Sequence, residues 1–297
     1  MSSTRLQVVL FCSVLTFAFA SLSFARPQEG QAIPTLGQPA EYETTSASAA
    51  EAPPVEEVGA IVANRPGFAE SPEVVGRGVS QVEMGLVVDR NGYGPSAVTT
   101  LTAPLGLMRL GLGDRAELQI GGEGGFARWE PNGHVRGGSD LDVGAKFKLL
   151  DQQHSGVNLA VAGIVNMPVG SSQFTSTGYD PGVKLAMART FGNGVSLTTN
   201  LQAASVTDAA GRFTQHAVSL TMSRALSATI SGFAEIYRIG QPTRGEAGAV
   251  SMAAGVARTV GSHLQLDLFA GRGLTDVACN WFVSAGFAVR RMPSGRP

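Results

Sequence analysis

Hydrophobic and polar residues alternate strictly in many short segments of this chain. In GSDLDVGAKFKLL, at residues 138–150, charged residues occupy alternate positions and apolar residues lie between them. A period of two is typical of a β-strand with one polar and one apolar face. The polar face carries Asp140, Asp142, Lys146 and Lys148, and the apolar face carries Leu141, Val143, Ala145, Phe147 and Leu149. The pattern alone leaves open whether the apolar face meets a protein core or lipid.

Similar segments follow one another from residue 80 onward, and none has the 3.6-residue period of a helix. An even number of strands, each near ten residues long, is what membrane-spanning antiparallel barrels use. We therefore predict an all-β fold, an antiparallel transmembrane β-barrel of about 12 strands. The predicted strands cover residues 80–89, 97–107, 116–124, 138–150, 157–167, 183–190, 195–203, 216–223, 227–237, 249–257, 264–271 and 281–290.

The connections between the predicted strands alternate in length. Short connections such as FGNG follow the even-numbered strands, and long ones such as PVGSSQFTSTGYDPG follow strands three, five, seven and nine. Outer-membrane barrels have short periplasmic turns and longer external loops. A soluble β-sandwich has no reason to sort its loops in this way, so the alternation favours an apolar face turned toward lipid.

The first 25 residues are predicted to be a secretory signal peptide. Arg5 supplies the positive start, residues 6–19 form an apolar run, and small residues offer cleavage sites after Ala20 or Ala25. The alternative is an uncleaved anchor helix, although this run is shorter than the roughly 20 apolar residues that a span requires. We therefore expect export of the chain and location in the bacterial outer membrane.

Composition divides the rest of the chain. Residues 26–62 are rich in Pro, Ala, Ser, Thr and Glu without periodicity, which predicts a disordered acidic linker. Residues 63–291 hold the predicted barrel, and residues 292–297 form a C-terminal tail. Only 15 % of the residues are charged, below the roughly 25 % of an ordinary soluble domain, and the net charge of −1 offers nucleic acid no basic surface.

The sequence offers no arrangement for covalent chemistry. No two of the four histidines have the spacing that would place both on one metal ion. His216 and Ser219 are three residues apart, so in a strand they face opposite sides, which argues against a Ser–His nucleophile. We predict no catalytic residues, no metal site and no cofactor. Cys279 is expected to be a free structural thiol, because Cys12 lies in the predicted signal peptide.

Charged residues on the polar strand faces are the candidate functional set. In a barrel they point into the lumen, where they either form a structural network or line the pathway of a solute. The aromatic residues near predicted strand ends, Trp129, Tyr179, Tyr237 and Trp281, would fit interfacial girdles. The lumen candidates are Glu83, Glu117, Asp140, Asp142, Lys146, Lys148, Lys184, Glu235, Asp267 and Arg290.

Several motifs occur in a recognisable order along the chain: NRPGF (64–68), GVSQVEMG (78–85), GSDLDVGAKFKLL (138–150), GYDPGVKLA (178–186) and NWFVSAGFAVR (280–290). Together they resemble the outer-membrane transporter family named for the MetA pathway of phenol degradation. The resemblance implies an outer-membrane β-barrel that transports solutes. Two features depart from the family's pattern: Asn64 and Asn280 stand where Asp is expected, and the chain ends in RRMPSGRP rather than on an aromatic residue.

Taken together, the residues and the resemblance predict a channel for passive or facilitated passage of small solutes, hydrophobic or aromatic ones among them. Its expected partners are outer-membrane lipid, a small-molecule solute and the outer-membrane assembly machinery. Two alternatives stay open: a lipid-modifying hydrolase of the outer membrane, and a structural or adhesive barrel with a closed lumen.

Overall fold

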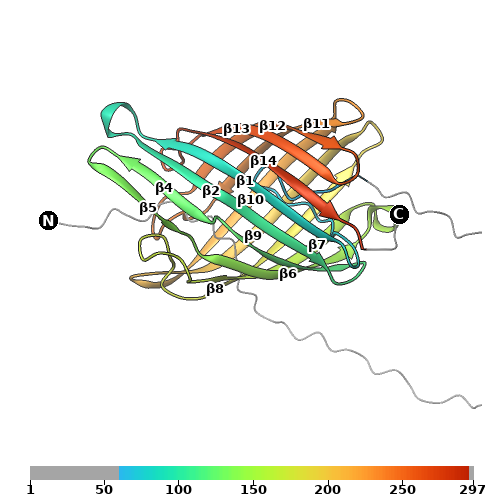
Figure 1. Cartoon of the computed structure of the whole chain (residues 1–297), viewed down its shortest axis with the longest axis horizontal. Helices are drawn as coiled ribbons and strands as arrows, with labels where there is room; N and C mark the ends of the chain where they lie inside the picture. Colours follow the sequence, from blue (N-terminus) through green and yellow to red (C-terminus); the bar gives the residue numbers. More distant parts are fainter. Residues whose placement is uncertain (1–59, 294–297) are drawn as a thin grey trace, which may run out of the picture. The chain divides into compact units, whose positions relative to one another are not determined.

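The computed structural model describes residues 60–293, and almost all of its regular structure is β-strand (Figure 1). Two short helical turns interrupt the strands, η1 (Gly94–Ser96) and α1 (Gln152–Ser155). The strands are β1 (Ser80–Asn91), β2 (Val98–Gly111), β3 (Ala116–Gly122), β4 (Gly125–Glu130), β5 (Gly133–Gly138), β6 (Leu141–Leu150), β7 (Asn158–Met167), β8 (Asp180–Thr190), β9 (Val195–Asp208), β10 (Gly211–Ala225), β11 (Ile230–Ile239), β12 (Ala249–Val260), β13 (Leu264–Gly273) and β14 (Trp281–Arg291).

All neighbouring strands pair antiparallel, and the sheet closes on itself because β1 pairs with both β14 and β2. Strand β2 pairs with β3 along one half and with β4 along the other, so β3 and β4 together form one wall strand. In the same way β6 pairs with β3 and β5 pairs with β4. The result is a closed barrel of 12 wall strands, which confirms the predicted fold class.

The interruption of β2 has a cause in the sequence. Its pairing with β4 ends at Thr102 and its pairing with β3 begins at Gly106, and Pro104 lies between them. Proline has no amide hydrogen to donate to a neighbouring strand. The register between β1 and β2 also shifts beside this point, between Gly85 and Val87. The barrel wall therefore changes partner where a backbone donor is missing.

Two of the long loops expected from the sequence are instead strand. The connection after β9 has only the two residues between Asp208 and Gly211, because β9 and β10 extend well beyond the predicted alternation. The segment GFARWEPNGHVRGG likewise forms the hairpin β4–β5. Alternation of polarity stops there because apolar residues such as Phe126, Ala204 and Val206 are buried on the inner side of these outer strand ends, where the inner face is no longer polar. The connections at the two ends of the barrel still differ in length as predicted: one end has short turns, and the other has projecting hairpins and loops.

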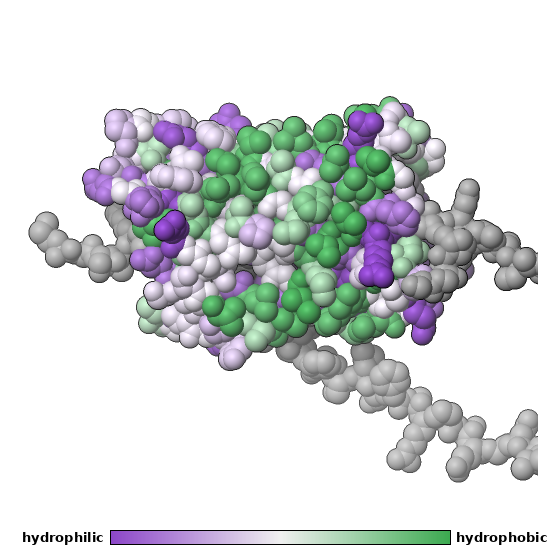
Figure 2. All heavy atoms as spheres, viewed as in Figure 1, coloured by the Kyte–Doolittle hydropathy of each residue, from purple (hydrophilic) through white to green (hydrophobic). Residues whose placement is uncertain are grey.

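Burial in the barrel is the reverse of that in a soluble protein. The largest fully buried side chains include Arg109, Lys146, Glu83 and Glu117. Exposed side chains along the strands are large and apolar, and Figure 2 shows them as green areas across the strands, with purple hydrophilic residues gathered toward the ends. Representative exposed residues are Leu86, Phe147, Leu201, Leu220, Ile236, Met252, Leu268 and Val283. Such a surface is stable against lipid tails rather than water.

Orientation of the 138–150 segment follows the predicted faces. Phe147 and Leu149 are exposed on the outer wall, whereas Asp140 and Lys146 are buried on the inner side. The alternation therefore places apolar residues outward and charged residues inward.

The residues before β1 lie inside the lumen, where they contact inward-facing residues of the wall. Residues 61–76 enter the barrel at the end with the short turns and return to that end, where Val79 leads into β1. Ile61 is 4 % exposed, although the composition of residues 26–62 had assigned it to the predicted linker. It is buried because it belongs to this inserted segment, which we call the lumen segment.

Three predicted regions lie wholly or largely outside the described residues: the signal peptide, most of the acidic linker and the last four residues of the tail. Among residues 60–293, no helix is both long and apolar enough to cross a membrane.

Candidate functional site

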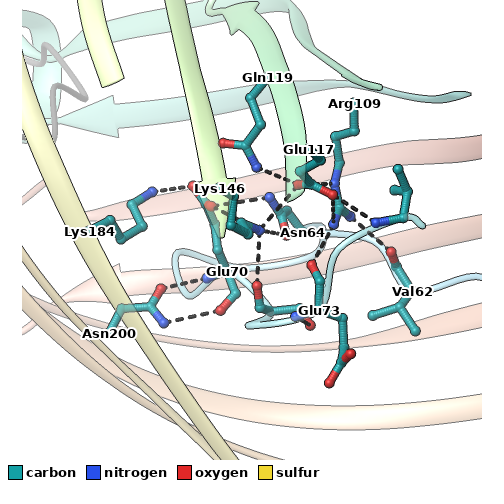
Figure 3. Close-up of polar contacts among 12 residues, drawn as sticks. Val62, Asn64, Glu70, Glu73, Arg109, Glu117, Gln119, Lys146, Lys184 and Asn200 are labelled. Atoms are coloured by element: carbon teal, nitrogen blue, oxygen red, sulfur yellow. Dashed lines mark hydrogen bonds and ion pairs between the residues drawn. The ribbon is translucent and has the colours of Figure 1, made fainter. Parts of the chain in front are cut away.

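The lumen segment is held on one side by a buried ionic network centred on Arg109 of β2 (Figure 3). The Arg109 guanidinium donates to Glu117 of β3 at 2.9 and 3.0 Å and to Glu83 of β1 at 3.2 Å. It also donates to the backbone carbonyls of Val62 and Glu73 in the lumen segment, at 3.0 and 2.7 Å. One side chain thus joins three wall strands to both limbs of the segment.

The carboxylates of this network complete their bonding with backbone amides. Glu83 accepts from the amides of Asn64 and Arg65 at 3.0–3.1 Å, and Glu117 accepts from the amide of Val75 at 2.8 Å. A buried charge is stable only when it is paired and hydrogen-bonded. The network meets that condition, so the segment and the wall depend on each other.

Lysines of β6 and β8 extend the network across the lumen. Lys146 donates to Asn64 Oδ1 and to the Ser71 carbonyl, and its Nζ lies 3.6 Å from both Glu70 and Glu117. Glu70 forms an ion pair with Lys184 of β8. Asn64, an amide where the family pattern suggests a carboxylate, therefore serves as the neutral acceptor for Lys146.

Arg65 occupies a slot made by two glycines that face each other on β1 and β14. Its guanidinium donates to Asp267 at 3.0 Å and to the Ser284 hydroxyl at 3.2 Å. A Cβ on Gly85 would lie 2.5 Å from the Arg65 Cζ, and one on Gly286 would lie 2.5 Å from its Nε. Glycine at both positions is what gives the guanidinium its space.

We expect Gly85→Ala to destabilise the barrel by about 1–3 kcal/mol, because the added methyl group displaces the Arg65 guanidinium from its partners. The matched control is Gly106→Ala, since a Cβ on Gly106 of β2 meets nothing within 4 Å. Urea-induced unfolding of both variants in the same detergent measures the difference. Equal stability of the two variants would show that the slot is not required.

The tip of the lumen segment is attached to the opposite wall by fewer contacts. Glu235 of β11 accepts hydrogen bonds from the amides of Phe68 and Ala69 at 2.7 and 2.8 Å. Asn200 of β9 accepts from the Glu70 amide at 2.6 Å and donates to the Glu70 carbonyl at 3.1 Å. These are backbone contacts, so they depend on the path of the chain more than on its side chains.

Beyond the tip, toward the long loops, lies a cavity of about 370 Å³. The ring of Phe68 stacks on Tyr237 of β11 with their centroids 4.5 Å apart, and both residues line the cavity. Phe269 and Phe282 also line it and make an edge-to-face contact at 6.2 Å. Aromatic rings packed in these geometries offer a preformed apolar surface to a small ligand.

The cavity extends to the loop between β13 and β14, where Cys279 is part of its lining. Burial raises the pKa of the Cys279 thiol to about 11. The thiol is therefore neutral near pH 7, and it adds no charge to the aromatic part of the cavity. Within residues 60–293, Cys279 forms no disulfide, in agreement with the free thiol expected from the sequence.

Seven of the ten lumen candidates contact the lumen segment. The other three contact different parts of the barrel. Asp140 accepts from the Gly170 and Ser176 amides and so anchors the loop between β7 and β8. Asp142 accepts from Asn166 and lines the cavity, and Arg290 donates to the Ser262 carbonyl. The seven that contact the segment are Glu83, Glu117, Lys146, Lys148, Lys184, Glu235 and Asp267.

Sequence reasoning missed the residues that these seven contact. Arg65, Phe68 and Glu70 precede the first strand and have no periodicity, so no pattern indicates that they lie in the lumen. Arg109 was also missed, because the predicted strand ends at residue 107 and the register shift opposite Gly85 and Val87 changes which residues of β2 face inward. The girdle interpretation is wrong for Tyr237, which points inward onto Phe68, while Trp129 and Trp281 are exposed.

A closed barrel with a lipid-compatible exterior and a charged interior defines the class of outer-membrane β-barrels. Within that class, residues 63–290 match the family model described as "Putative MetA-pathway of phenol degradation". The chain belongs to this family, as the sequence motifs indicated. The match includes the tip of the lumen segment as well as the wall strands.

One of the similar solved structures supports the same fold. An outer membrane channel of the COG4313 group from Pseudomonas putida F1 is 12 % identical with a TM-score of 0.58, and the alignment covers 76 % of this chain and all of that one. The KdgM and NanC porins are 10 % and 11 % identical with TM-scores of 0.45, covering 70 % and 71 % of this chain and 98 % of theirs. No curated protein sequence matches the chain.

Proposed function

We propose that this protein is an outer-membrane channel for small apolar or aromatic solutes, which enter from the cell exterior and pass through the lumen to the periplasm. The observation that carries the proposal is the cavity of about 370 Å³ lined by Phe68, Tyr237, Phe269 and Phe282. A cavity of this size accommodates a molecule with one aromatic ring, and ligand sites are commonly about 300–1,000 Å³. The family description and the name of the Pseudomonas putida F1 protein of the same fold agree with this proposal.

Four of the charged lumen candidates are proposed to contact a solute in this cavity. Glu83, Asp142, Lys184 and Glu235 contribute to its lining. Three of them also hold the lumen segment, so their first effect is on its position. Asp142 accepts a hydrogen bond from Asn166 of the wall rather than from the lumen segment, and it is therefore the residue most directly suited to selecting solutes by polarity.

The remaining functional expectations belong to the same proposal. An apolar exterior implies outer-membrane lipid as the surrounding medium. Export by the N-terminal signal and insertion by the outer-membrane assembly machinery would bring the chain there.

The experiment is ionic current through single molecules of the full chain in a planar bilayer, with phenol as the probe and cyclohexanol as its non-aromatic match. We expect a measurable conductance that phenol interrupts more strongly than cyclohexanol does, because the ring stacks on the cavity aromatics. Absence of any conductance and of any phenol flux would overturn the channel proposal.

We expect Phe282→Ala to weaken the interruption of the current by phenol by roughly tenfold, since an aromatic contact and its burial contribute about 1–2 kcal/mol. Phe287→Ala is the matched control, because Phe287 is on the same strand and is exposed on the outer face. The concentration of phenol that halves the current measures both effects. Equal changes in the two variants would place phenol outside the cavity.

A barrel with a permanently closed lumen is the second candidate, because the lumen segment crosses the interior and contacts both walls. It would give no current in the same experiment, and the loops would then carry the function. Hydrolysis of lipid by the purified protein, lost on replacing one histidine, would instead support the hydrolase alternative.

A further inference from the structure

A single strip of chain separates two cavities inside the barrel. The first is the aromatic cavity, and the second, of about 250 Å³, lies toward the short-turn end. Gly67 and Phe68 line only the first, and Pro66 and Ala69 line only the second. The partition between the two cavities is therefore one chain thick at its tip.

The two ends of this strip are attached to the wall formed by β13, β14, β1, β2, β3 and β6. On the N-terminal side, the Arg65 guanidinium lies in its glycine slot against Asp267, and Glu83 accepts the Arg65 amide. On the C-terminal side, the Ser71 carbonyl accepts from Lys146, and Arg109 holds the Glu73 carbonyl. Moving these ends would leave buried charges without partners, which is strongly unfavourable.

The residues between these ends, Gly67–Glu70, close against the other wall and have replaceable contacts. Their contacts with that wall are the Glu235 and Asn200 bonds to the backbone, the Glu70–Lys184 ion pair and the stacking of Phe68 on Tyr237. On the fixed side, the Glu70 carboxylate also accepts from Asn64 at 3.1 Å and lies 3.6 Å from Lys146. Gly67 has a φ of +101°, a conformation that a side chain would oppose. The four residues therefore begin at a glycine whose backbone has access to conformations closed to other residues, and they have fixed neighbours on both sides.

The second cavity offers space and hydrogen-bond partners on the side toward which these residues would move. Polar atoms that leave their partners in a lumen must find others, and hydroxyl groups can both donate and accept. Four hydroxyl-bearing residues from β9, β10 and β11 line this cavity: Thr198, Thr221, Ser223 and Ser231.

We propose that Gly67–Glu70 is a flap that gates the channel, and that solutes pass from the aromatic cavity into the second cavity between this flap and the wall of β8–β11. The inference rests on the proposed channel function and names its route and its closing residues. The rest of the lumen segment stays in place when the flap moves. Glu235, Asn200 and Lys184 hold the closed position.

The first test is the fraction of time that single molecules of the full chain conduct in 1 M KCl. Asn200→Ala and Glu70→Gln are expected to raise the open-to-closed ratio by about tenfold each, the effect of losing hydrogen bonds or a charge pair at a closing contact. Lys148→Gln is the matched control, because Lys148 contacts Glu73 on the fixed side, and its ratio should not change. Conductance that is unchanged in both flap variants would overturn the flap.

The second test is designed to block the proposed route instead of opening it. Ala69→Phe fills the second cavity and should lower both conductance and phenol flux, while phenol added from the long-loop side still interrupts the residual current at the wild-type concentration, because the aromatic cavity is unchanged. Unchanged flux in Ala69→Phe would place the route elsewhere in the lumen. Wild-type conductance is measured beside each variant. If the wild-type protein gives no current, the channel proposal is wrong; if it conducts but the variants behave like it, only the flap proposal is wrong.

Discussion

Replacing Arg109 by alanine should lower the free energy of unfolding of the barrel by about 3–5 kcal/mol, the usual cost of removing one member of a buried charge network. Arg109 is completely buried, and its five hydrogen bonds reach Glu83, Glu117 and two backbone carbonyls. Without it, two buried carboxylates lose their main cationic partner. Lys146 lies 3.6 Å from Glu117 and compensates in part for that one residue.

Urea-induced unfolding in detergent or lipid vesicles measures this effect, with Arg77→Ala as the control. Arg77 pairs with Asp114 at 3.7 Å, and both side chains are mostly exposed, so its loss should cost about 0–1 kcal/mol. The double variant Arg109→Ala/Glu117→Gln should be less destabilised than the sum of the single variants, because the two residues share one interaction. If Arg109→Ala were as mild as Arg77→Ala, the network would not stabilise the fold.

Replacing Leu268 by arginine should destabilise the protein in lipid by about 2–4 kcal/mol, the cost of a cation facing hydrocarbon at mid-depth. Leu268 is at the centre of β13 with its side chain 53 % exposed on the outer wall. In a soluble β-protein, the same substitution at so exposed a position would change stability by less than about 0.5 kcal/mol. The size of the effect therefore tests directly whether lipid surrounds the barrel.

Leu226→Arg provides the comparison at a different depth. Leu226 is 65 % exposed and lies in the short turn between β10 and β11, where an arginine reaches water and should cost about 0–1 kcal/mol. Refolding of both variants into vesicles of one lipid gives the two free energies. A cost that does not depend on depth would contradict a membrane-spanning wall.

Alternation predicted the wall of the barrel well, because every wall strand has one face in the lumen and one face outside. That requirement is local, and it is visible in segments such as 138–150 and 264–271. It stops at the outer ends of β9 and β10, where the buried inner face carries apolar Ala204 and Val206, and the strands there extend further than the polarity pattern does. At β11 the predicted start, residue 227, falls in the turn, and the strand begins at Ile230.

The contents of the lumen could not be predicted in the same way. Glu83, Glu117 and Lys146 were identified as inward-facing, but nothing in their spacing indicates that their partners are backbone amides and carbonyls. A segment that lies within a barrel has no repeating environment and therefore no period. Even the charged residues of NRPGFAE at 64–70 indicate only that the segment is polar; their partners are up to about 219 positions away in the chain, as Ser284 is from Arg65.

The position of Arg65 has a consequence for the order of assembly. Its side chain bonds to β13 and β14, while its amide bonds to β1, so it crosses the junction where the first and last strands of the barrel meet. Contacts between residues so distant in sequence require the whole chain to be present before they form. The first described residues of the protein thus acquire their final environment only after the last strand is in place, and the glycine slot of Gly85 and Gly286 exists only in the closed ring.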